Sequence, residues 1–338
     1  MTIRHPYFLF LGEAQDQLAA KTSIGVGQWR PDWCVGQLRL KGCKADSGFP
    51  DMTVEQAAKA GAKTMIIGTV TRGGKFSEDW IALLTRAMEL GMDLAAGLHR
   101  RLADVPELAA AAKRHRRAIF DVRHPTQTFE VGNGIPRRGK RVLTVGTDCS
   151  IGKMYTSLAL EGEMRKRGLK ADFRATGQTG VLIAGSGVAI DAVVSDFVAG
   201  AVEWLAPAND ADHWDLIEGQ GSLFHPSYAG VTMGLIHGSQ ADALVMCHEP
   251  GRPHMRGLPH YKLPDLQHCI DVNVAAARLT NPKAKCVAVS LNTSALGEKA
   301  ALRAIAKVED KIGLPCVDPA RTGVGRVIDR LLKIKGRA

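Results

Sequence analysis

Short apolar runs alternate with amphipathic segments along the whole chain. In the N-terminal part, strands are predicted at residues 7–11, 35–40, 64–70 and 94–98, with a further apolar run at 118–122. Helices are predicted at residues 13–20, 53–60, 77–90 and 106–116. We expect Thr53 and Ser77 to cap the second and third of these helices. This alternation indicates a parallel sheet covered on both faces by helices.

The C-terminal part repeats the same pattern. Strands are predicted at residues 142–145, 169–174, 214–217, 242–247, 284–291 and 315–318. Helices are predicted after the first strand, at 195–205, from 225 onward, at 266–279, at 300–312 and at the end of the chain. Residues 124–139 lie between the two parts and carry two prolines and three glycines without periodicity, which is typical of a linker.

The predicted fold class is therefore α/β, in two domains. Residues 1–139, linker included, form an N-terminal Rossmann-like domain, and residues 140–338 form a P-loop NTPase-like, doubly wound parallel-sheet domain. A chain of 338 residues with 45% hydrophobic residues is long enough for two ordinary cores.

The net charge of +10 narrows the class of ligand. The 44 lysines and arginines are scattered, and only residues 113–117 form a tight basic run, best explained as a solvated helix end. Nucleic-acid binders usually show a clustered stripe or a recognisable motif, and this chain has neither, with aromatics at 5%. Small anionic ligands suit the excess positive charge.

The cysteines and the apolar segments indicate a cytoplasmic protein. The seven cysteines are dispersed without any Cys-x-x-Cys pair, which favours free thiols in a reducing compartment. The N-terminal segment has too short an apolar core for a secretory signal. No apolar run approaches the roughly 18 residues of a membrane span.

A glycine-bracketed loop between the strand at 142–145 and the next helix predicts a phosphate site. Its glycines let backbone N–H groups face an anion, Lys153 adds a point charge, and the helix N-terminus adds about half a positive charge. The candidate cofactor-binding residues are Gly146, Thr147, Asp148, Cys149, Ser150, Ile151, Gly152, Lys153, Met154 and Tyr155.

This loop departs from the usual phosphate loop in two ways. Five residues instead of four separate Gly146 from Gly152, and Met154 stands where a Ser or Thr hydroxyl normally ligates Mg²⁺. Thr156 lies two residues further along and need not point to the same place. The loop therefore suits a phosphate-bearing cofactor that is bound but not hydrolysed.

Two further strands end in residues that can carry chemistry. Glu218 follows the strand at 214–217, and the Gly-rich turn at 219–222 offers backbone N–H groups. His225 begins the next segment and is expected to face the same edge. As alternatives, Glu218 is a solvated strand-end carboxylate and His225 a helix-cap histidine.

Arginines in loops are the candidates for gripping carboxylates. Arg252 and Arg256 lie in a proline-stiffened loop after the strand at 242–247, and Arg72 lies in a basic turn after the strand at 64–70. With Gln220, these three are the candidate substrate-binding residues. His99 is a weaker candidate of the same kind. His248, His254 and His260 match no metal-ligand spacing, so no metal is predicted.

Four separated motifs together resemble the D-glutamate N-acetyltransferase family. They are GTDCSIGKMYT, EGQGSLFHPSYAG, CHEPGRPHMRG and the N-terminal pair GTVTRGGKFSEDW and GLHRRL. The phosphate domain alone is also similar to dethiobiotin synthetases, which carry a Mg²⁺-binding hydroxyl where this chain has Met154. The resemblance implies acetyl transfer from acetyl-CoA to the amine of D-glutamate, in D-amino-acid catabolism, with acetyl-CoA as co-substrate.

In that reaction a general base takes a proton from the ammonium, with Glu218 as first choice and His225 as second. Cys149 is a nucleophile only as an alternative to a packing role. Two other functions stay open: an ATP-dependent ligase or kinase of the dethiobiotin-synthetase type, and a non-catalytic nucleotide sensor. Neither nucleic acid nor membrane is an expected partner, and exposed sheet edges are compatible with a homo-oligomer.

Overall fold

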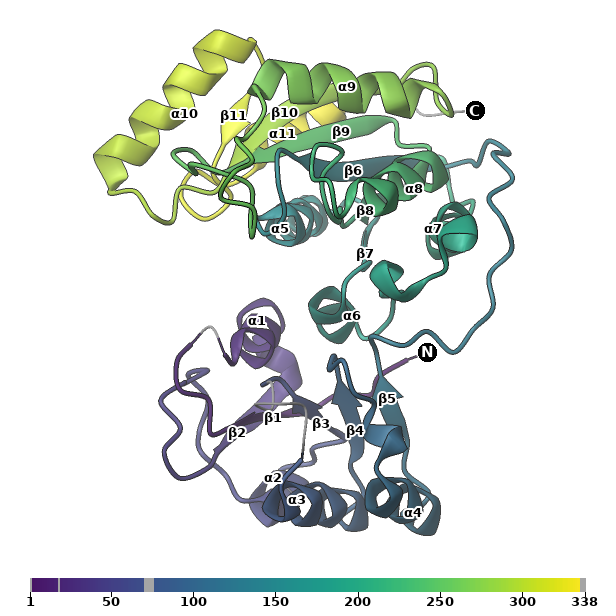
Figure 1. Cartoon of the computed structure of the whole chain (residues 1–338), viewed down its shortest axis with the longest axis vertical. Helices are drawn as coiled ribbons and strands as arrows, with labels where there is room; N and C mark the ends of the chain where they lie inside the picture. Colours follow the sequence, from purple (N-terminus) through teal and green to yellow (C-terminus); the bar gives the residue numbers. More distant parts are fainter. Residues whose placement is uncertain (1, 18, 70–75, 335–338) are drawn as a thin grey trace. The chain divides into compact units, whose positions relative to one another are not determined.

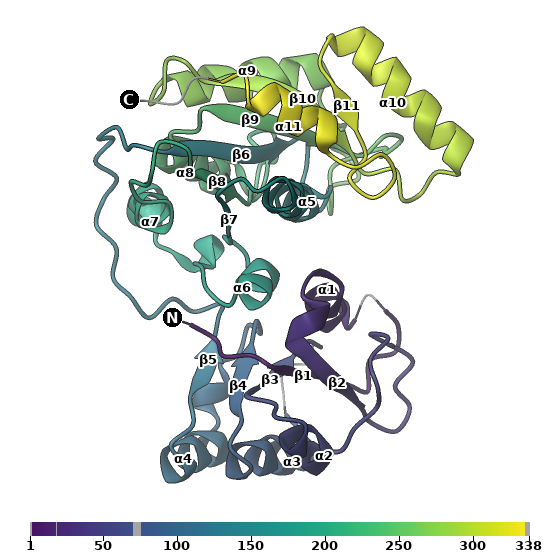
Figure 2. The ribbon, with the colours of Figure 1, turned by 180° about the vertical axis from the view of Figure 1, so that it is seen from behind.

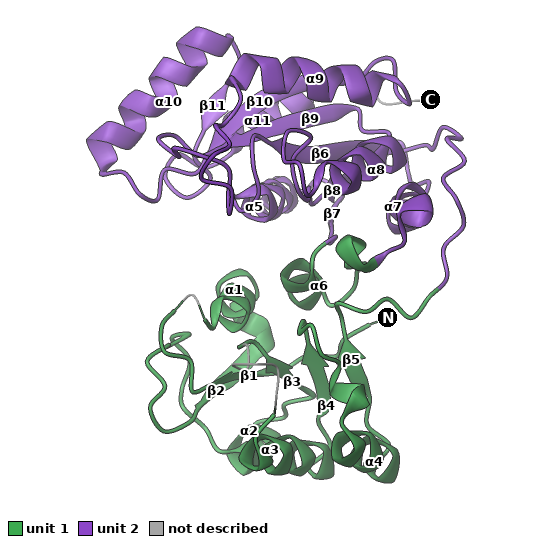
Figure 3. Ribbon diagram, viewed as in Figure 1, with its two compact units in different colours: residues 1–127, 177–192 green, residues 128–176, 193–338 purple. Residues whose placement is uncertain are grey.

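The computed structural model describes residues 2–17, 19–69 and 76–334. They fold into two compact units, the first made of residues 1–127 and 177–192 and the second of residues 128–176 and 193–338 (Figure 3). Each unit has its own parallel β-sheet with helices on both faces (Figure 1). The predicted fold class of two α/β domains is thus confirmed.

The division of the chain differs from the predicted boundary after residue 139. The units separate after Gln127, and residues 177–192 return to the first unit. That segment contains helix α6 (Gln178–Ala184), whose Thr179 hydroxyl lies 3.2 Å from the Thr22 hydroxyl. A linker is visible in composition, whereas a short segment that packs on a distant part of the chain leaves no compositional signal.

The first unit is a five-stranded sheet. Its strands are β1 (Tyr7–Gly12), β2 (Cys34–Arg39), β3 (Thr64–Ile67), β4 (Asp93–Ala96) and β5 (Ile119–Asp121), and besides α6 its helices are α1 (Lys21–Trp29), α2 (Val54–Lys59), α3 (Glu78–Glu89) and α4 (Pro106–His115). The strand order β2-β1-β3-β4-β5 is parallel throughout. The order reverses at β1, and such a switch point opens a crevice outside the carboxyl ends of the strands.

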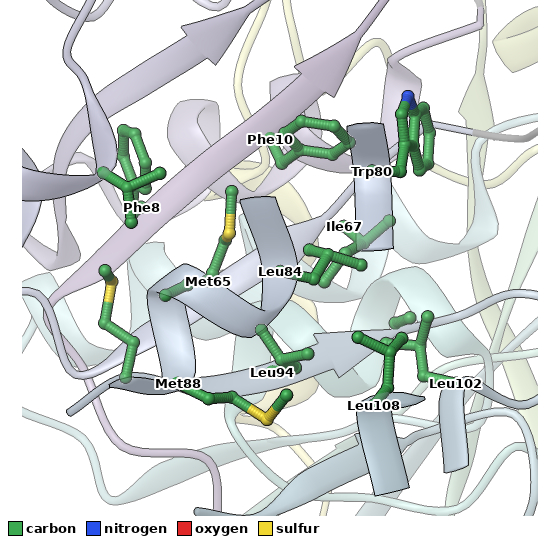
Figure 4. Close-up of a cluster of buried hydrophobic side chains, with 14 of the residues drawn as sticks. Phe8, Phe10, Met65, Ile67, Trp80, Leu84, Met88, Leu94, Leu102 and Leu108 are labelled. Carbon is green, nitrogen blue, oxygen red and sulfur yellow. The ribbon is translucent and has the colours of Figure 1, made fainter. Parts of the chain in front are cut away.

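One face of this sheet packs on α3 and α4 through a continuous apolar core. Phe8 and Phe10 of β1 are fully buried against Trp80 and Leu84 of α3, and the Phe10 and Trp80 rings meet edge to face at 4.6 Å (Figure 4). The predicted caps are confirmed: the Thr53 and Ser77 side chains accept hydrogen bonds from the N–H groups three residues later.

The first helix begins later than predicted. Residues 13–17 and 19–20 form turns and bends, in which Asp16 accepts a hydrogen bond from the N–H of Ala19, and α1 begins at Lys21. The polar run after β1 has good helix formers but no apolar stripe to bury. Helix α1 has such a face, and a Cβ on its Gly27 would lie 2.7 Å from the Phe49 ring.

The second unit is a six-stranded sheet. Its strands are β6 (Lys140–Gly146), β7 (Ala171–Arg174), β8 (Trp214–Ile217), β9 (Ala243–His248), β10 (Lys285–Leu291) and β11 (Cys316–Val317). Its helices are α5 (Lys153–Lys166), α7 (Val198–Leu205), α8 (Ala229–Ser239), α9 (Leu266–Arg278), α10 (Glu298–Ile312) and α11 (Gly325–Leu331).

In this sheet the order is β11-β10-β9-β6-β8-β7, all parallel, so β6 lies in the middle, between β9 and β8. Alternate residues of the strands enter two cores, one with α5 and α11 and the other with α8, α9 and α10 (Figure 2). The loops after β6, β8 and β9 therefore meet at one edge. Within the described residues, no helix has the length and apolarity that a bilayer crossing requires.

Candidate functional site

The predicted phosphate loop links β6 to α5 at the centre of the second sheet. Gly146 is closely packed, because a Cβ there would lie 2.5 Å from Cδ1 of Ile151, which would have to shift. Ser150 and Gly152 both have positive φ angles, of 52° and 102°, which turn the loop back toward the start of α5. The loop thus has the strand, turn and helix context that an anion site needs.

Lys153 places its ammonium group inside this loop. The residue is only 7% exposed, and Nζ donates a hydrogen bond of 2.7 Å to the Asp148 carbonyl. Burial lowers the pKa of Lys153, and no carboxylate among the described residues forms an ion pair with it. A buried lysine without a carboxylate partner is costly, so an incoming anion would gain a strong interaction here.

The hydroxyl of Thr156, two residues further along α5, does not replace the one that Met154 displaces. Thr156 is buried, donates to the Gly152 carbonyl and lies 2.8 Å from the Ser290 hydroxyl. Its hydroxyl is therefore committed to the sheet behind the loop. The backbone N–H groups of the loop and the ammonium of Lys153 are donors that suit phosphate oxygens.

Arg252 ties the loop after β9 to the phosphate loop. Its guanidinium donates to Asp148 at 2.7 Å, to the carbonyls of Cys149 and Ser150, and to Glu249. Asp148 is fully buried and also accepts a hydrogen bond of 2.8 Å from the backbone N–H of Arg256. Arg252 therefore braces the two loops against each other.

Arg256, the second arginine of this loop, is held only through its backbone. Its side chain is exposed, and no described residue pairs with its guanidinium. It lies close enough to Cys149 to lower the pKa of that thiol, although burial has the larger effect and raises the pKa overall. Of the two predicted arginines, Arg256 is the one whose fork is available to a ligand.

Glu218 follows β8 and lies beside the phosphate loop, because β8 is a neighbour of β6. Its carboxylate is 4% exposed and accepts hydrogen bonds from the Thr176 N–H at 2.9 Å and from Gln220 Nε2 at 3.1 Å. The adjacent Gly219 must be glycine, since a Cβ would lie 1.7 Å from the Thr144 carbonyl oxygen. The N–H of Gly219 donates to the Thr144 hydroxyl. Among the backbone N–H groups of the 219–222 turn, this one is therefore not available to a ligand.

Gln220, predicted to bind substrate, donates to Glu218 and positions its carboxylate. His225 is also held in one orientation by its hydrogen bonds. His225 is 2% exposed, its Nδ1 accepts from the N–H of Ser227, and its Nε2 donates to the Arg256 carbonyl at 3.1 Å. Its ring also stacks on Tyr228 with a centroid distance of 4.6 Å. Both ring nitrogens are occupied, so in this state His225 anchors the backbone of Arg256.

Sequence reasoning considered His248 only as a metal ligand. It ends β9, and its Nδ1 lies 3.0 Å from the hydroxyl of Thr147 in the phosphate loop, while burial lowers its pKa. A histidine at a strand end beside the phosphate strand is the signal that points to this contact. Asp148, Cys149 and His225 bring ligand-type atoms within 4.8 Å of one another, but the Asp148 oxygens and the His225 nitrogens already have partners.

Two predicted residues are not assigned to this cluster. Arg72 lies outside the described residues. Tyr155 is 39% exposed on α5. The remaining candidates gather at one edge of the second unit, where the loops after β6, β8 and β9 meet.

Comparison with known proteins decides the family. Residues 130–328 match the domain described as "Domain of unknown function (DUF1611_C) P-loop domain". Residues 38–125 match "Domain of unknown function (DUF1611_N) Rossmann-like domain". The chain belongs to the DUF1611 family. The Rossmann-like and P-loop descriptions agree with the two predicted domains.

Curated DUF1611 relatives carry an activity in their names. A protein of Tritonibacter scottomollicae described as "D-glutamate N-acetyltransferase" is 55% identical over 98% of this chain and 100% of its own length. A protein of Pseudoalteromonas sp with the same description is 47% identical over 98% of this chain and 100% of its own. The predicted resemblance to D-glutamate N-acetyltransferases is confirmed.

A solved DUF1611 structure matches the whole chain. The crystal structure of a DUF1611 family protein from Anabaena variabilis is 34% identical, covers 98% of this chain and 100% of its own, and has a TM-score of 0.84. The fold of this chain is therefore similar over nearly its whole length to that of this family member.

Proposed function

We propose that this protein is an acyltransferase that moves the acetyl group of acetyl-CoA to the amine of D-glutamate. The acceptor and the reaction are supported by the two full-length relatives with that activity in their names. The donor is supported by the phosphate loop, whose buried Lys153 and backbone amides suit phosphates that are held and not cleaved. Loss of the Mg²⁺-binding hydroxyl at Met154 fits a donor that needs no hydrolysis.

In the proposed reaction, the glutamate ammonium first loses a proton to Glu218. The free amine then attacks the thioester carbonyl and a C–N bond forms. The C–S bond breaks, the nitrogen loses its second proton to give the amide, and the leaving sulfur takes up one proton to become the CoA thiol. The carbonyl oxygen gains negative charge during attack and needs N–H donors. The amides of residues 220–222 remain candidates, whereas that of Gly219 is committed to Thr144.

The central test of this function is a turnover assay with wild-type protein. Acetyl-CoA is incubated with a panel of D- and L-amino acids, and free thiol is followed over time. We expect thiol release with D-glutamate and formation of N-acetyl-D-glutamate. Formation of ADP from ATP with any amino acid, without need for acetyl-CoA, would instead support the ligase or kinase.

Arg256→Gln should weaken acceptor binding selectively. Its guanidinium has no partner among the described residues and is free to grip a carboxylate. Loss of such a charge-assisted pair removes about 1.5–3 kcal/mol, so we expect the KM for D-glutamate to rise about 10- to 100-fold. The KM for acetyl-CoA should stay near the wild-type value. Equal loss for both substrates would contradict this role.

Arg252→Gln is the natural comparison for that variant. Arg252 joins Asp148, Glu249 and two phosphate-loop carbonyls, so its loss should loosen the loop that binds the donor. We expect the KM for acetyl-CoA to rise with a lowered Tm, a pattern opposite to that of Arg256→Gln. Steady-state kinetics and thermal unfolding of the two variants side by side measure the difference.

Cys149→Ala should leave the reaction intact. The thiol is half-buried and burial raises its pKa, which disfavours the nucleophilic thiolate. We expect turnover within about twofold of wild type, and intact-mass analysis of wild-type protein after incubation with acetyl-CoA should detect no acetylated protein. An acetyl adduct that disappears in the Cys149→Ala variant would replace direct transfer with a covalent intermediate.

A further inference from the structure

The first unit contains a cavity of about 450 Å³ that the proposed chemistry does not use. It lies where the carboxyl ends of β3 and β4 meet the starts of α1 and α6, and all of its lining residues belong to the first unit. Its volume is in the range of small-molecule sites. The strand order of this sheet reverses at β1, and the loop after β1 carries Asp16, which lines the cavity.

Two glycines at strand ends let the helices close the walls of this cavity. A Cβ on Gly68, after β3, would lie 1.8 Å from the Ser23 hydroxyl of α1. A Cβ on Gly97, after β4, would lie 2.8 Å from the Gln178 side chain of α6. The hydrogen bond between the Thr22 and Thr179 hydroxyls joins the two helices directly. Close packing of α1 and α6 on these strand ends thus forms one part of the cavity wall.

The lining offers several polar groups that the protein leaves unused. Thr69 is 4% exposed, its methyl group faces Gly12, and its hydroxyl has no hydrogen-bond partner among the described residues. Within the described residues, three further lining groups have no polar partner in the protein: the exposed Lys21 ammonium and His99 ring, and the half-buried Gln178 amide. These groups are therefore available to hydrogen-bond a molecule bound in the cavity.

The cavity is bordered by charged groups of both signs, which suits a ligand that carries negative and positive groups. Lys21 and Arg123 are cationic, and Arg123 is held in place by Asp191 at 2.7 Å. Helix α1 begins at Lys21 with no acidic residue in its first turn, so its N-terminus adds further positive potential. Asp16 is the acidic residue in the lining, and one of its oxygens accepts from the N–H of Ala19, which leaves the other for an ammonium group.

We propose that this cavity is a binding site for a small dicarboxylate that carries an amino group. Lys21 and Arg123 would receive its carboxylates, Asp16 its ammonium, and Thr69 would supply a hydrogen bond. The site goes beyond the proposed acetyl transfer; only the choice of D-glutamate as the first probe rests on that function. D-glutamate, the acceptor of the proposed reaction, has two carboxylates and an ammonium group, and so do other amino dicarboxylates. The probes must therefore distinguish D-glutamate from these other ligands.

The test is calorimetric titration of the whole protein in the presence of saturating CoA, which permits no turnover. The probes are D-glutamate, L-glutamate and glutarate, which lacks the amino group. The titrations use the Arg256→Gln background, so that a carboxylate held beside the phosphate loop does not mask the cavity. We expect D-glutamate to bind this protein, and Lys21→Gln or Arg123→Gln to weaken its affinity at least about tenfold.

Matched controls lie in the same unit but away from the cavity. Lys63 is exposed before β3, at the opposite edge of the sheet, and Arg114 is exposed in the last turn of α4. Lys63→Gln and Arg114→Gln should leave the affinity unchanged. Thr69→Val keeps the shape of the buried side chain and should weaken binding about threefold even if a charge variant folds poorly. Asp16→Asn should remove the preference for D-glutamate over glutarate.

Absence of any binding to the Arg256→Gln protein, or affinities unaffected by Lys21→Gln, Arg123→Gln and Thr69→Val, would overturn the proposal. Stronger binding of L-glutamate than of D-glutamate would support the cavity while pointing to a ligand other than the acceptor. Turnover of the wild-type protein is measured separately. A protein that turns over D-glutamate with an empty cavity refutes only this inference, and one that binds in the cavity without turnover refutes only the proposed function.

Discussion

Lys153→Met should raise the KM for acetyl-CoA about 100-fold or more while leaving the protein folded. The ammonium lies inside the phosphate loop, 7% exposed, and its only described hydrogen bond goes to the Asp148 carbonyl. A hydrogen bond to a charged group contributes about 1.5–3 kcal/mol, and a lysine among phosphates makes more than one. Each 1.4 kcal/mol is a factor of ten in affinity, so the loss is large.

The same variant should not lower the Tm and is expected to raise it slightly. Methionine fills nearly the same volume and removes a buried charge that pays a desolvation cost in the free protein. That cost is what lowers the pKa of Lys153. A binding residue that is unfavourable for stability is typical of a functional site, and the opposite signs of the two effects separate function from folding.

Titration with CoA and thermal unfolding measure both effects. Lys166→Met is the matched control, because Lys166 is exposed in the last turn of the same helix. It should change neither quantity. Unchanged affinity for CoA in Lys153→Met would mean that the donor's phosphates bind elsewhere, and the role of the loop would have to be abandoned.

Glu218→Gln should lower kcat about 10²- to 10⁴-fold with little change in the KM for acetyl-CoA. That range is the usual contribution of a positioned general base, and an amide cannot take the proton of the glutamate ammonium. The carboxylate is held by the Thr176 N–H and by Gln220 Nε2. In the variant the side-chain amide of Gln220 can rotate by 180° and accept a hydrogen bond from the new amide at position 218. The geometry of the site should therefore be retained.

The control for this change is Glu309→Gln, a partly exposed carboxylate that pairs with Arg326 in the same unit. It should retain wild-type turnover. Loss of kcat in Glu218→Gln with unchanged CoA affinity would support proton transfer as the affected step. Normal turnover in Glu218→Gln would remove Glu218 from the mechanism, and His248, which contacts Thr147 of the loop, would then be the next group to test.

The general fold and the phosphate loop could be predicted because their signals are local. Alternating apolar runs and amphipathic segments predict parallel α/β units, and a strand, a glycine turn, a lysine and a helix predict the anion site. The displaced first helix is an exception: residues 13–20 have helix-forming composition, but α1 at Lys21–Trp29 is the segment with a face to bury. Composition shows which segments can form a helix, and burial in the folded protein determines which of them does.

The roles of the site residues depend on which strands become neighbours. Arg252 and Arg256 are equivalent in the sequence, yet one is bound to Asp148 and Glu249 while the side chain of the other remains exposed. His225 is one of two candidate bases in the sequence, but in the fold its two ring nitrogens are taken by Ser227 and the Arg256 carbonyl. The partners that decide these roles, Asp148 for Arg252 and the Arg256 carbonyl for His225, are distant in the chain, and no local pattern encodes them.

The sequence by itself determined two parallel α/β domains, a phosphate loop without its Mg²⁺-binding hydroxyl, and the family to which the chain is similar. Only the tertiary structure decided that residues 177–192 join the first unit, that Arg256 is the available arginine, and that Lys21, Thr69 and Arg123 surround one cavity. The physical reason is the distance along the chain over which each kind of interaction acts. Periodicity and turn chemistry act over a few residues, whereas cavities and hydrogen-bond partners arise from residues that are distant in the chain and adjacent only after folding.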